Sequence, residues 1–85
     1  MSPASVFKDD HQRSAREHLA ANLVLMRRAR GWSQEHLALE AGLHRTFVAH
    51  VERGVRNISL DNIEKLAVVF EVEVYSLLVP HSSSE

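Results

Sequence analysis

The sequence predicts a single all-α domain, and three observations support this prediction. Apolar residues recur every three or four positions through most of the chain, which is the spacing of one face of a helix. Serine or glycine residues lie at the ends of these runs, where they suit helix caps. The 85 residues provide room for one domain, and a domain of this size buries only about 60% of its unfolded surface, so a second subunit would add stability.

The first helix is expected from about His11, after a flexible N-terminal arm over residues 1–10 that has no apolar period. It is expected to end near Gly31. Its inward stripe, spaced by three and four, consists of Leu19, Leu23, Met26 and Arg27. Val24 and Leu25 fall outside this stripe, which fits scattered surface positions as well as a contact with the N-terminal extension or with another subunit.

Two short helices joined by a tight turn are expected between Ser33 and Gly54. Ser33 suits the N-cap of the first, because its hydroxyl can accept a hydrogen bond from a free amide in the first helical turn. Gly42 suits the turn, because a residue without Cβ tolerates left-handed dihedral angles. The apolar run between these two residues is Leu37, Ala38 and Ala41.

The second of these helices, over about residues 44–53, has an apolar and a polar face. Its buried stripe is expected to consist of Phe47, Val48 and Val51. The residues on the other side are Arg45, Thr46, Ala49 and His50. The helix therefore presents a short polar face to a partner.

A further helix is expected after Ser59, whose hydroxyl can cap it. Its inward residues are expected to be Leu60, Ile63, Leu66, Ala67 and Phe70. The next stretch, residues 71–79, alternates for five positions, so periodicity alone leaves a strand and a helix both open. Residues 80–85 begin with Pro80 and are expected to form a disordered tail.

Charge is distributed unevenly along the chain. The formal net charge of -1 argues against a nucleic-acid partner. However, residues 1–60 hold nine Lys and Arg against six Asp and Glu, net +3, whereas residues 61–85 hold one Lys against five acids, net -4. This pattern fits a DNA-facing part with an acidic far side, and random scatter in a small protein is the alternative.

The composition argues against a metal site and against an enzyme. There is no cysteine, and the six histidines are never three or four residues apart, the spacing that places two ligands on one helix face. The sequence has no nucleophile elbow and no glycine-rich loop. We therefore expect no metal, no cofactor, no small-molecule ligand and no enzyme activity.

The chain shows no targeting or membrane signal. Its first 15 residues hold no apolar core of signal-peptide length, and no apolar run approaches the roughly 20 residues that span a bilayer. The lack of cysteine also fits a reducing compartment. We expect a soluble cytoplasmic protein without a membrane partner.

Two segments, SQEHLALEAGL and HRTFVAHVERG, resemble the helix-turn-helix of the phage-repressor and Cro-like (XRE) family of DNA-binding regulators. The shared pattern is a Ser-Gln start, a Leu-Ala pair in the first helix, Gly at the turn, and an apolar-Glu-x-Gly end to the second, recognition helix. The resemblance runs from about Leu19 to Leu78. The segments HRTF and ERGVRN are similar to the subgroup that includes controller proteins of restriction-modification systems.

This resemblance implies a compact five-helix, lambda-repressor-like domain over residues 11–79, with the helix-turn-helix at its second and third helices. It favours a short fifth helix over about residues 74–78 rather than a strand. The chain departs from the family at Glu71, where a helix-ending Gly is usual, and at Glu73, where a Ser or Asp cap is usual. The junction before the fifth helix is therefore the least determined boundary.

The family also implies a function: a sequence-specific transcriptional regulator that binds an inverted-repeat operator in double-stranded DNA as a homodimer. The positions that match base-contacting residues are Arg45, Thr46 and His50. The positions that match phosphate-contacting residues are Gln34, His44, Arg53, Arg56 and Asn57. Arg45 is the strongest candidate reader, because a guanidinium can donate two parallel hydrogen bonds to guanine.

Two further contacts are expected. Arg27 and Glu52 occupy positions where the family carries Arg and Glu, and both lie on or beside apolar stripes, so they should form a buried ion pair. The excess of large apolar residues near the C-terminus suggests a dimer interface formed by Val72, Val74, Tyr75, Leu77 and Leu78, although Leu77 also suits the core. The alternative function is an antitoxin-like or adaptor module that acts mainly through protein contacts.

Overall fold

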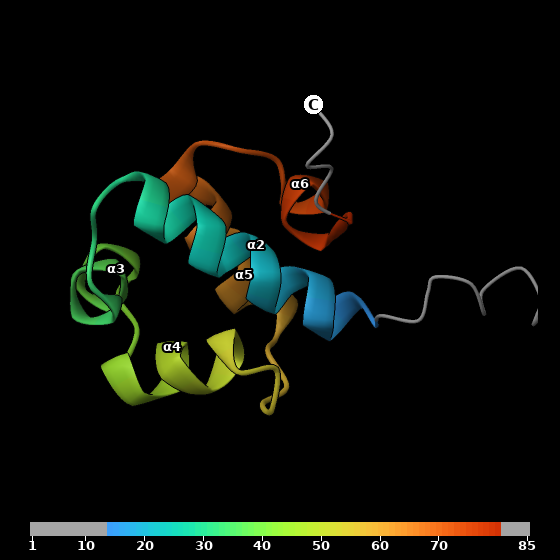
Figure 1. The fold of residues 1–85 in the computed structure, drawn as a ribbon, viewed down its shortest axis with the longest axis horizontal. Coiled ribbons are helices and arrows are strands. Elements are labelled where there is room, and N and C mark those ends of the chain that lie inside the picture. The colour runs from blue at the N-terminus through green and yellow to red at the C-terminus, as the bar shows by residue number, and fades with distance from the viewer. Residues whose placement is uncertain (1–13, 81–85) are drawn as a thin grey trace, which may run out of the picture.

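The computed structural model describes residues 14–80 and contains, in that range, five helices and no strand. The helices are α2 (Ala15–Ala29), α3 (Gln34–Ala41), α4 (Arg45–Glu52), α5 (Leu60–Phe70) and α6 (Val74–Leu78). Figure 1 shows α2 crossing the middle of the domain, with α4 below it and α6 on the side away from α4. The predicted all-α, five-helix fold is confirmed, whereas the predicted arm over residues 1–10 and the tail beyond Pro80 lie outside the described residues.

Helix α2 begins later than the sequence suggested. Ser14, in extended conformation, is its N-cap: the Ser14 hydroxyl accepts from the Glu17 amide at 3.2 Å, and the Glu17 carboxylate accepts from the Ser14 amide at 2.9 Å. This reciprocal capping box fixes the start at Ala15 rather than near His11. At the other end, Gly31 turns the chain at φ 70°, where the helix was expected to end.

The predicted caps of α3 and α5 are present. The Ser33 hydroxyl accepts from the His36 amide at 2.9 Å, and the Ser59 hydroxyl accepts from the Asn62 amide at 3.1 Å. Gly42 ends α3 with φ 72°. Glu71 ends α5 with φ 60°, so a residue with a Cβ holds the left-handed conformation in which the family usually carries glycine.

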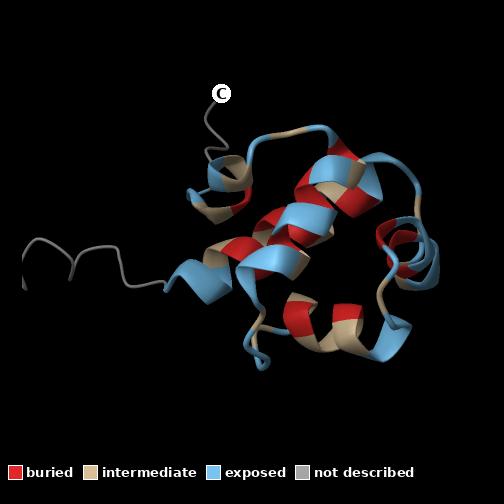
Figure 2. Ribbon diagram, turned by 180° about the vertical axis from the view of Figure 1, so that it is seen from behind, coloured by how far each residue is buried: buried red, intermediate tan, exposed pale blue. Residues whose placement is uncertain are grey.

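The core is built from all five helices. Figure 2 shows the buried positions on the sides of the helices that face one another. The largest fully buried side chains are Leu19, Leu23, Leu37, Val48, Val51, Leu66 and Leu77. The prediction that Leu60 faces inward is wrong, because its side chain is 71% exposed. Leu60 is the first residue of α5, and it extends the apolar stripe past the end of the core.

The stretch 71–79, which periodicity left open, forms the short helix α6. The helix stops at Leu78 because Val79 is extended, as expected for the residue before Pro80. The side chain of Asn22, buried in α2, donates to the carbonyl oxygens of Leu77 at 2.9 Å and Val79 at 2.8 Å. This amide therefore takes two of the carbonyls that a helix end leaves without an intrahelical partner.

No helix in the described part of the chain has both the length and the apolar character required to cross a bilayer.

Candidate nucleic-acid interface

Helix α4 is attached to the domain by one face only. Val48 and Val51 are fully buried and Phe47 is half-buried against the core. Arg45 and Thr46, at the start of the helix, are exposed, and His50 is half-buried. The first turn of α4 therefore projects its polar side chains into solvent, as the sequence predicted for a recognition helix.

The N-terminus of α4 carries no side-chain cap. His44 occupies the N-cap position in extended conformation and accepts no cap hydrogen bond through its side chain. The amides of the first turn thus have no side-chain acceptor within the described residues, and a helix N-terminus of this kind favours an anionic partner. The preceding turn is fixed by the Leu43 amide, which donates to the Ala38 carbonyl at 2.8 Å.

The C-terminal end of α4 is fixed by Glu52. The Arg27 guanidinium donates to the Glu52 carboxylate through Nε at 2.7 Å and through Nη2 at 2.9 Å. The Gln34 side-chain amide donates to the same carboxylate at 2.8 Å. One carboxylate thus joins α4 to α2 and to the start of α3, which holds the two helices of the helix-turn-helix at a set angle.

This ion pair is deeply placed. The side chains of Arg27 and Glu52 are only 11% and 4% exposed. Hydrogen bonding to Glu52 raises the pKa of Arg27, and this effect outweighs the desolvation that lowers it. Arg27 also donates to the carbonyl of Trp32 at 2.8 Å, so its donors on both edges have partners.

The loop after α4 carries the other predicted phosphate contacts. Arg53 is the C-cap of α4 and is exposed. The guanidinium of Arg56 lies over the ring of Phe47, 5.2 Å from its centroid. Asn57 is exposed, and its side-chain oxygen accepts a hydrogen bond from Arg16 at 2.6 Å.

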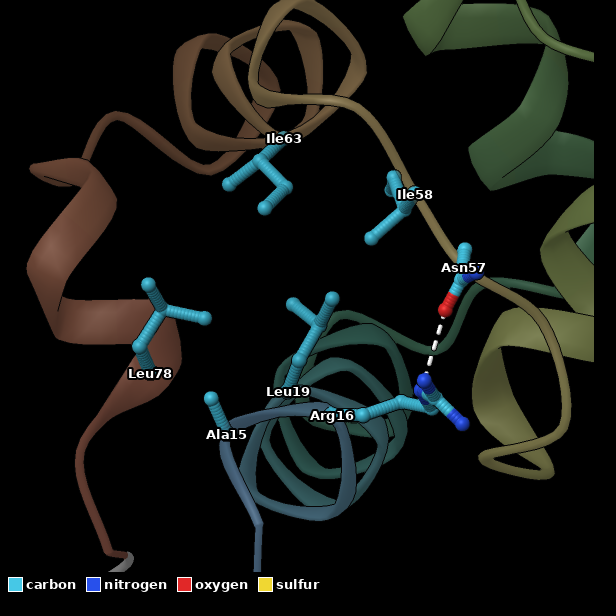
Figure 3. Close-up of a pocket in the computed structure, with 7 residues that line it drawn as sticks. All are labelled: Ala15, Arg16, Leu19, Asn57, Ile58, Ile63 and Leu78. Carbon is cyan, nitrogen blue, oxygen red and sulfur yellow. Dashed lines mark hydrogen bonds between the residues drawn. The ribbon is translucent and has the colours of Figure 1, made fainter.

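The Arg16–Asn57 contact was not anticipated. It joins the first turn of α2 to the loop after the recognition helix, across 41 positions of sequence (Figure 3). Helix periodicity places Arg16 in line with Leu19 and Leu23, but it lies exposed in the first turn of α2, and nothing in the local pattern identifies its partner. The two residues form the rim of a mostly apolar pocket of about 240 Å³, lined also by Ala15, Leu19, Ile58, Ile63 and Leu78.

The predicted dimer residues divide into two groups. Tyr75 is 68% exposed, and Val72, Val74 and Leu78 are half-buried. Leu77 is 0% exposed, so its assignment to a dimer contact is wrong: it packs in the core of this chain. The reason is the helical period of α6, which turns Leu77 inward when Tyr75 faces outward.

A mainly apolar groove lies between α2 and the end of α6. It is lined by Asn22, Leu25, Met26, Ala29, Ser76, Val79 and Pro80. Leu25 is 44% exposed, and Val24 is half-buried. Of the two residues outside the predicted stripe of α2, Leu25 therefore adds apolar surface next to α6.

Comparisons with known proteins place the chain in a family. Residues 23–77 match HTH_3, the Helix-turn-helix family. The Neisseria hypothetical transcription factor of Neisseria meningitidis serogroup B is 49% identical over 69 residues, which span 81% of this chain and 65% of that relative's length. The crystal structure of the hypothetical transcription factor NHTF from Neisseria has a TM-score of 0.78 and 48% identity, covering 84% of this chain and 82% of that chain.

Two further solved structures are informative. The restriction-modification controller protein C.AhdI from Aeromonas hydrophila has a TM-score of 0.69 and 45% identity, covering 73% of this chain and 94% of its own. SinR, the master regulator for biofilm formation, was solved in complex with DNA; it has a TM-score of 0.68 and 29% identity, covering 72% of this chain and 98% of its own. These relatives are regulators, not enzymes. The chain belongs to HTH_3, the XRE-type helix-turn-helix family that its sequence resembles.

Proposed function

We propose that the protein is a DNA-binding transcriptional regulator that binds an inverted-repeat operator as a homodimer, with α4 in the major groove. The observation that carries the proposal is the placement of α4: its first turn is exposed and polar, while its other end is fixed by the Arg27–Glu52 pair. Fixed geometry matters because base-edge hydrogen bonds require side chains at defined positions.

Arg45, Thr46 and His50 are the proposed base readers. Arg45 and Thr46 stand exposed in the first turn of α4, the part of a recognition helix that contacts base edges. Arg45 can donate two hydrogen bonds to O6 and N7 of guanine, and Thr46 can offer its hydroxyl to a base or its methyl group to thymine. His50, one turn further along, can donate to guanine N7.

Gln34, His44, Arg53, Arg56 and Asn57 are the proposed phosphate contacts. Gln34 gives one amide hydrogen to Glu52, which leaves the second for a phosphate. The oxygen of Asn57 is taken by Arg16, which orients its amide hydrogens toward other acceptors. These contacts fix position on the duplex and carry no sequence information themselves.

Homodimerisation is proposed through the C-terminal part. Tyr75, with the half-buried Val72, Val74 and Leu78, offers apolar surface beyond what this chain covers. A two-fold dimer would present its recognition helices to one face of the duplex, about 34 to 36 Å apart. The relatives named above come from bacteria, whose chromosome lies in the cytoplasm, so a cytoplasmic location is proposed for this protein.

The direct test is an electrophoretic mobility shift with the DNA immediately upstream of the protein's own gene. Specific retention of that fragment, resistant to excess scrambled duplex, supports the proposal. Retention of neither fragment would favour the alternative, a helix-turn-helix module that acts through protein contacts.

A further inference from the structure

A second groove opens beside the start of α4. It lies between the α3–α4 turn, the loop after α4 and helix α5. The residues that give it its chemistry are His44, Thr46, Phe47, Arg56, Asn62 and Lys65. Three of these side chains are basic or can become so, they come from three different segments, and no carboxylate lines the groove.

Lys65 lies at the border between this groove and the acidic side of α5. Residues 61–85 contain one lysine and five acids. No carboxylate of the described residues 14–80 lies within salt-bridge distance of Lys65. The fold also places it beside His44 and Arg56.

Arg56 is held at this groove by an aromatic contact. Its guanidinium lies 5.2 Å from the ring centroid of Phe47, a distance at which a cation is attracted by the negative ring face. Phe47 itself packs against the core. This contact favours a position of the exposed Arg56 charge near the first turn of α4.

We propose that this groove holds a backbone phosphate of bound DNA, with Lys65 and Asn62 on α5 completing the site formed by Arg56 and His44. The inference deepens the proposed function, on which it rests, by extending the DNA-contacting surface to a helix outside the helix-turn-helix. A lysine ammonium is a compact charge with three donors and suits a phosphate as a point contact. The groove opens beside Thr46 in the first turn of α4, so it would lie close to the duplex when α4 enters the major groove.

The opposite side of Lys65 marks the edge of this surface. A neighbouring groove on α5 is lined by Ser59, Asp61, Asn62, Glu64, Lys65 and Val68. Two carboxylates there repel phosphate. The duplex is therefore expected to approach Lys65 from the side of α4, and the acidic side of α5 to face away from DNA.

The test compares Lys65→Gln with the parent protein on a footprinted cognate duplex and a scrambled duplex, with affinities measured by fluorescence anisotropy between about 50 and 200 mM salt. Log K falls as log salt rises, and each lost phosphate contact should make this slope shallower by about 0.9. For a dimer, which loses two contacts, the slope should be shallower by about two units. Over that salt range the affinity of Lys65→Gln should fall about twelvefold less than that of the parent. The preference for the cognate duplex should stay parental.

Two variants serve as controls. Lys65→Arg keeps the charge and should keep the parental slope. Arg28→Gln removes one positive charge from the exposed last turn of α2 and should also keep it. A parental slope in Lys65→Gln, an equal loss in Arg28→Gln, or a changed base preference in Lys65→Gln would each overturn the inference while leaving the proposed function standing. A parent that prefers neither duplex would instead overturn the proposed function and this inference with it.

Discussion

The Arg27 guanidinium and the Glu52 carboxylate face each other edge to edge, joined by hydrogen bonds of 2.7 and 2.9 Å. The two residues lie 25 positions apart, and their pairing connects the long helix α2 to the last turn of α4. Because both side chains are buried, the pair removes two charges from water and must satisfy them internally. Gln34 and the Trp32 carbonyl complete that satisfaction.

Removing one partner of this pair should be strongly destabilising. Glu52→Ala leaves the Arg27 charge buried without a carboxylate, which costs about 3 to 5 kcal/mol. Glu52→Gln keeps the volume and one acceptor, so its loss should be smaller. Thermal and denaturant melts of both variants measure the effect, and melting curves that match the parent would show that the pair is dispensable.

The pH dependence of this pair follows from Arg27. Its pKa is raised in the folded state by the bond to Glu52, so the stabilisation that depends on its charge is fully present below its ordinary, already strongly basic pKa. It is lost only as pH rises through the folded value. Arg27 stays charged across this range, so its contribution to the free energy of unfolding that is lost on substitution of Glu52 should be the same at pH 6 as at about pH 9.

Replacing an arginine inside the recognition helix and replacing one beyond it should have different effects on DNA binding. Arg45→Ala should cost about 1 to 3 kcal/mol on the preferred site and relax discrimination at one base pair per half-site, because it removes a base-edge contact. Arg56→Ala should weaken all sequences alike and flatten the salt dependence by about one unit per phosphate contact, about two for a dimer.

Titrations of both variants against cognate and scrambled duplexes at several salt concentrations separate these outcomes. Equal losses of Arg45→Ala on both duplexes, together with altered base preference in Arg56→Ala, would reverse the roles of reader and anchor.

Two substitutions in the C-terminal helix α6 should distinguish dimer association from folding of the protomer. Tyr75→Glu places a charge on exposed surface, so it should leave the melting temperature near that of an isolated protomer while shifting the protein to monomer. Leu77→Ala opens a cavity in the core and should cost about 2 to 5 kcal/mol. Sedimentation at tens of micromolar with and without DNA, alongside melts, distinguishes the two effects. A parent that sediments as a monomer in both conditions would remove the dimer proposal.

The Asn22 side chain should be needed for stable packing of α6 against α2. Asn22→Leu fills a similar volume but removes both hydrogen bonds to the carbonyls of Leu77 and Val79, leaving one buried and one partly buried acceptor unpaired. The expected loss is about 1 to 3 kcal/mol, and amide exchange of α6 should accelerate. Unchanged stability and exchange would mean that water replaces the amide without cost.

Local patterns were sufficient for the caps of α3 and α5 and for the inward stripe of α2, but not for the start of α2 or for the short helix α6. Ser33, Gly42 and Ser59 act where their chemistry predicted, because a cap depends on atoms within three or four residues. The stripe Leu19, Leu23 and Arg27 faces inward for the same local reason. Leu60 is exposed because periodicity identifies an apolar face without showing where the opposing core ends.

Contacts between distant segments could not be derived this way. Two examples are the hydrogen bonds of Arg16 with Asn57 and of Asn22 with the end of α6. Both depend on how the helices pack, and the residue type alone does not predict a partner more than 40 positions away. Lys65 was counted with the acidic C-terminal part because charge along the sequence ignores which groove a helix side lines. The Arg27–Glu52 pair is predicted from the family resemblance together with the position of both charges on or beside apolar stripes.

The central claim is specific recognition of a two-fold symmetric DNA site, and footprinting of the DNA upstream of the protein's own gene tests it most directly. We predict protection of an inverted repeat whose half-sites are centred about one helical turn, roughly 34 to 36 Å, apart. Arg45→Ala should need a higher protein concentration than the parent for this protection, because it lowers affinity for the preferred site. Protection of a single unsymmetrical half-site, or protection of no site at concentrations where the protein is folded, would contradict the account.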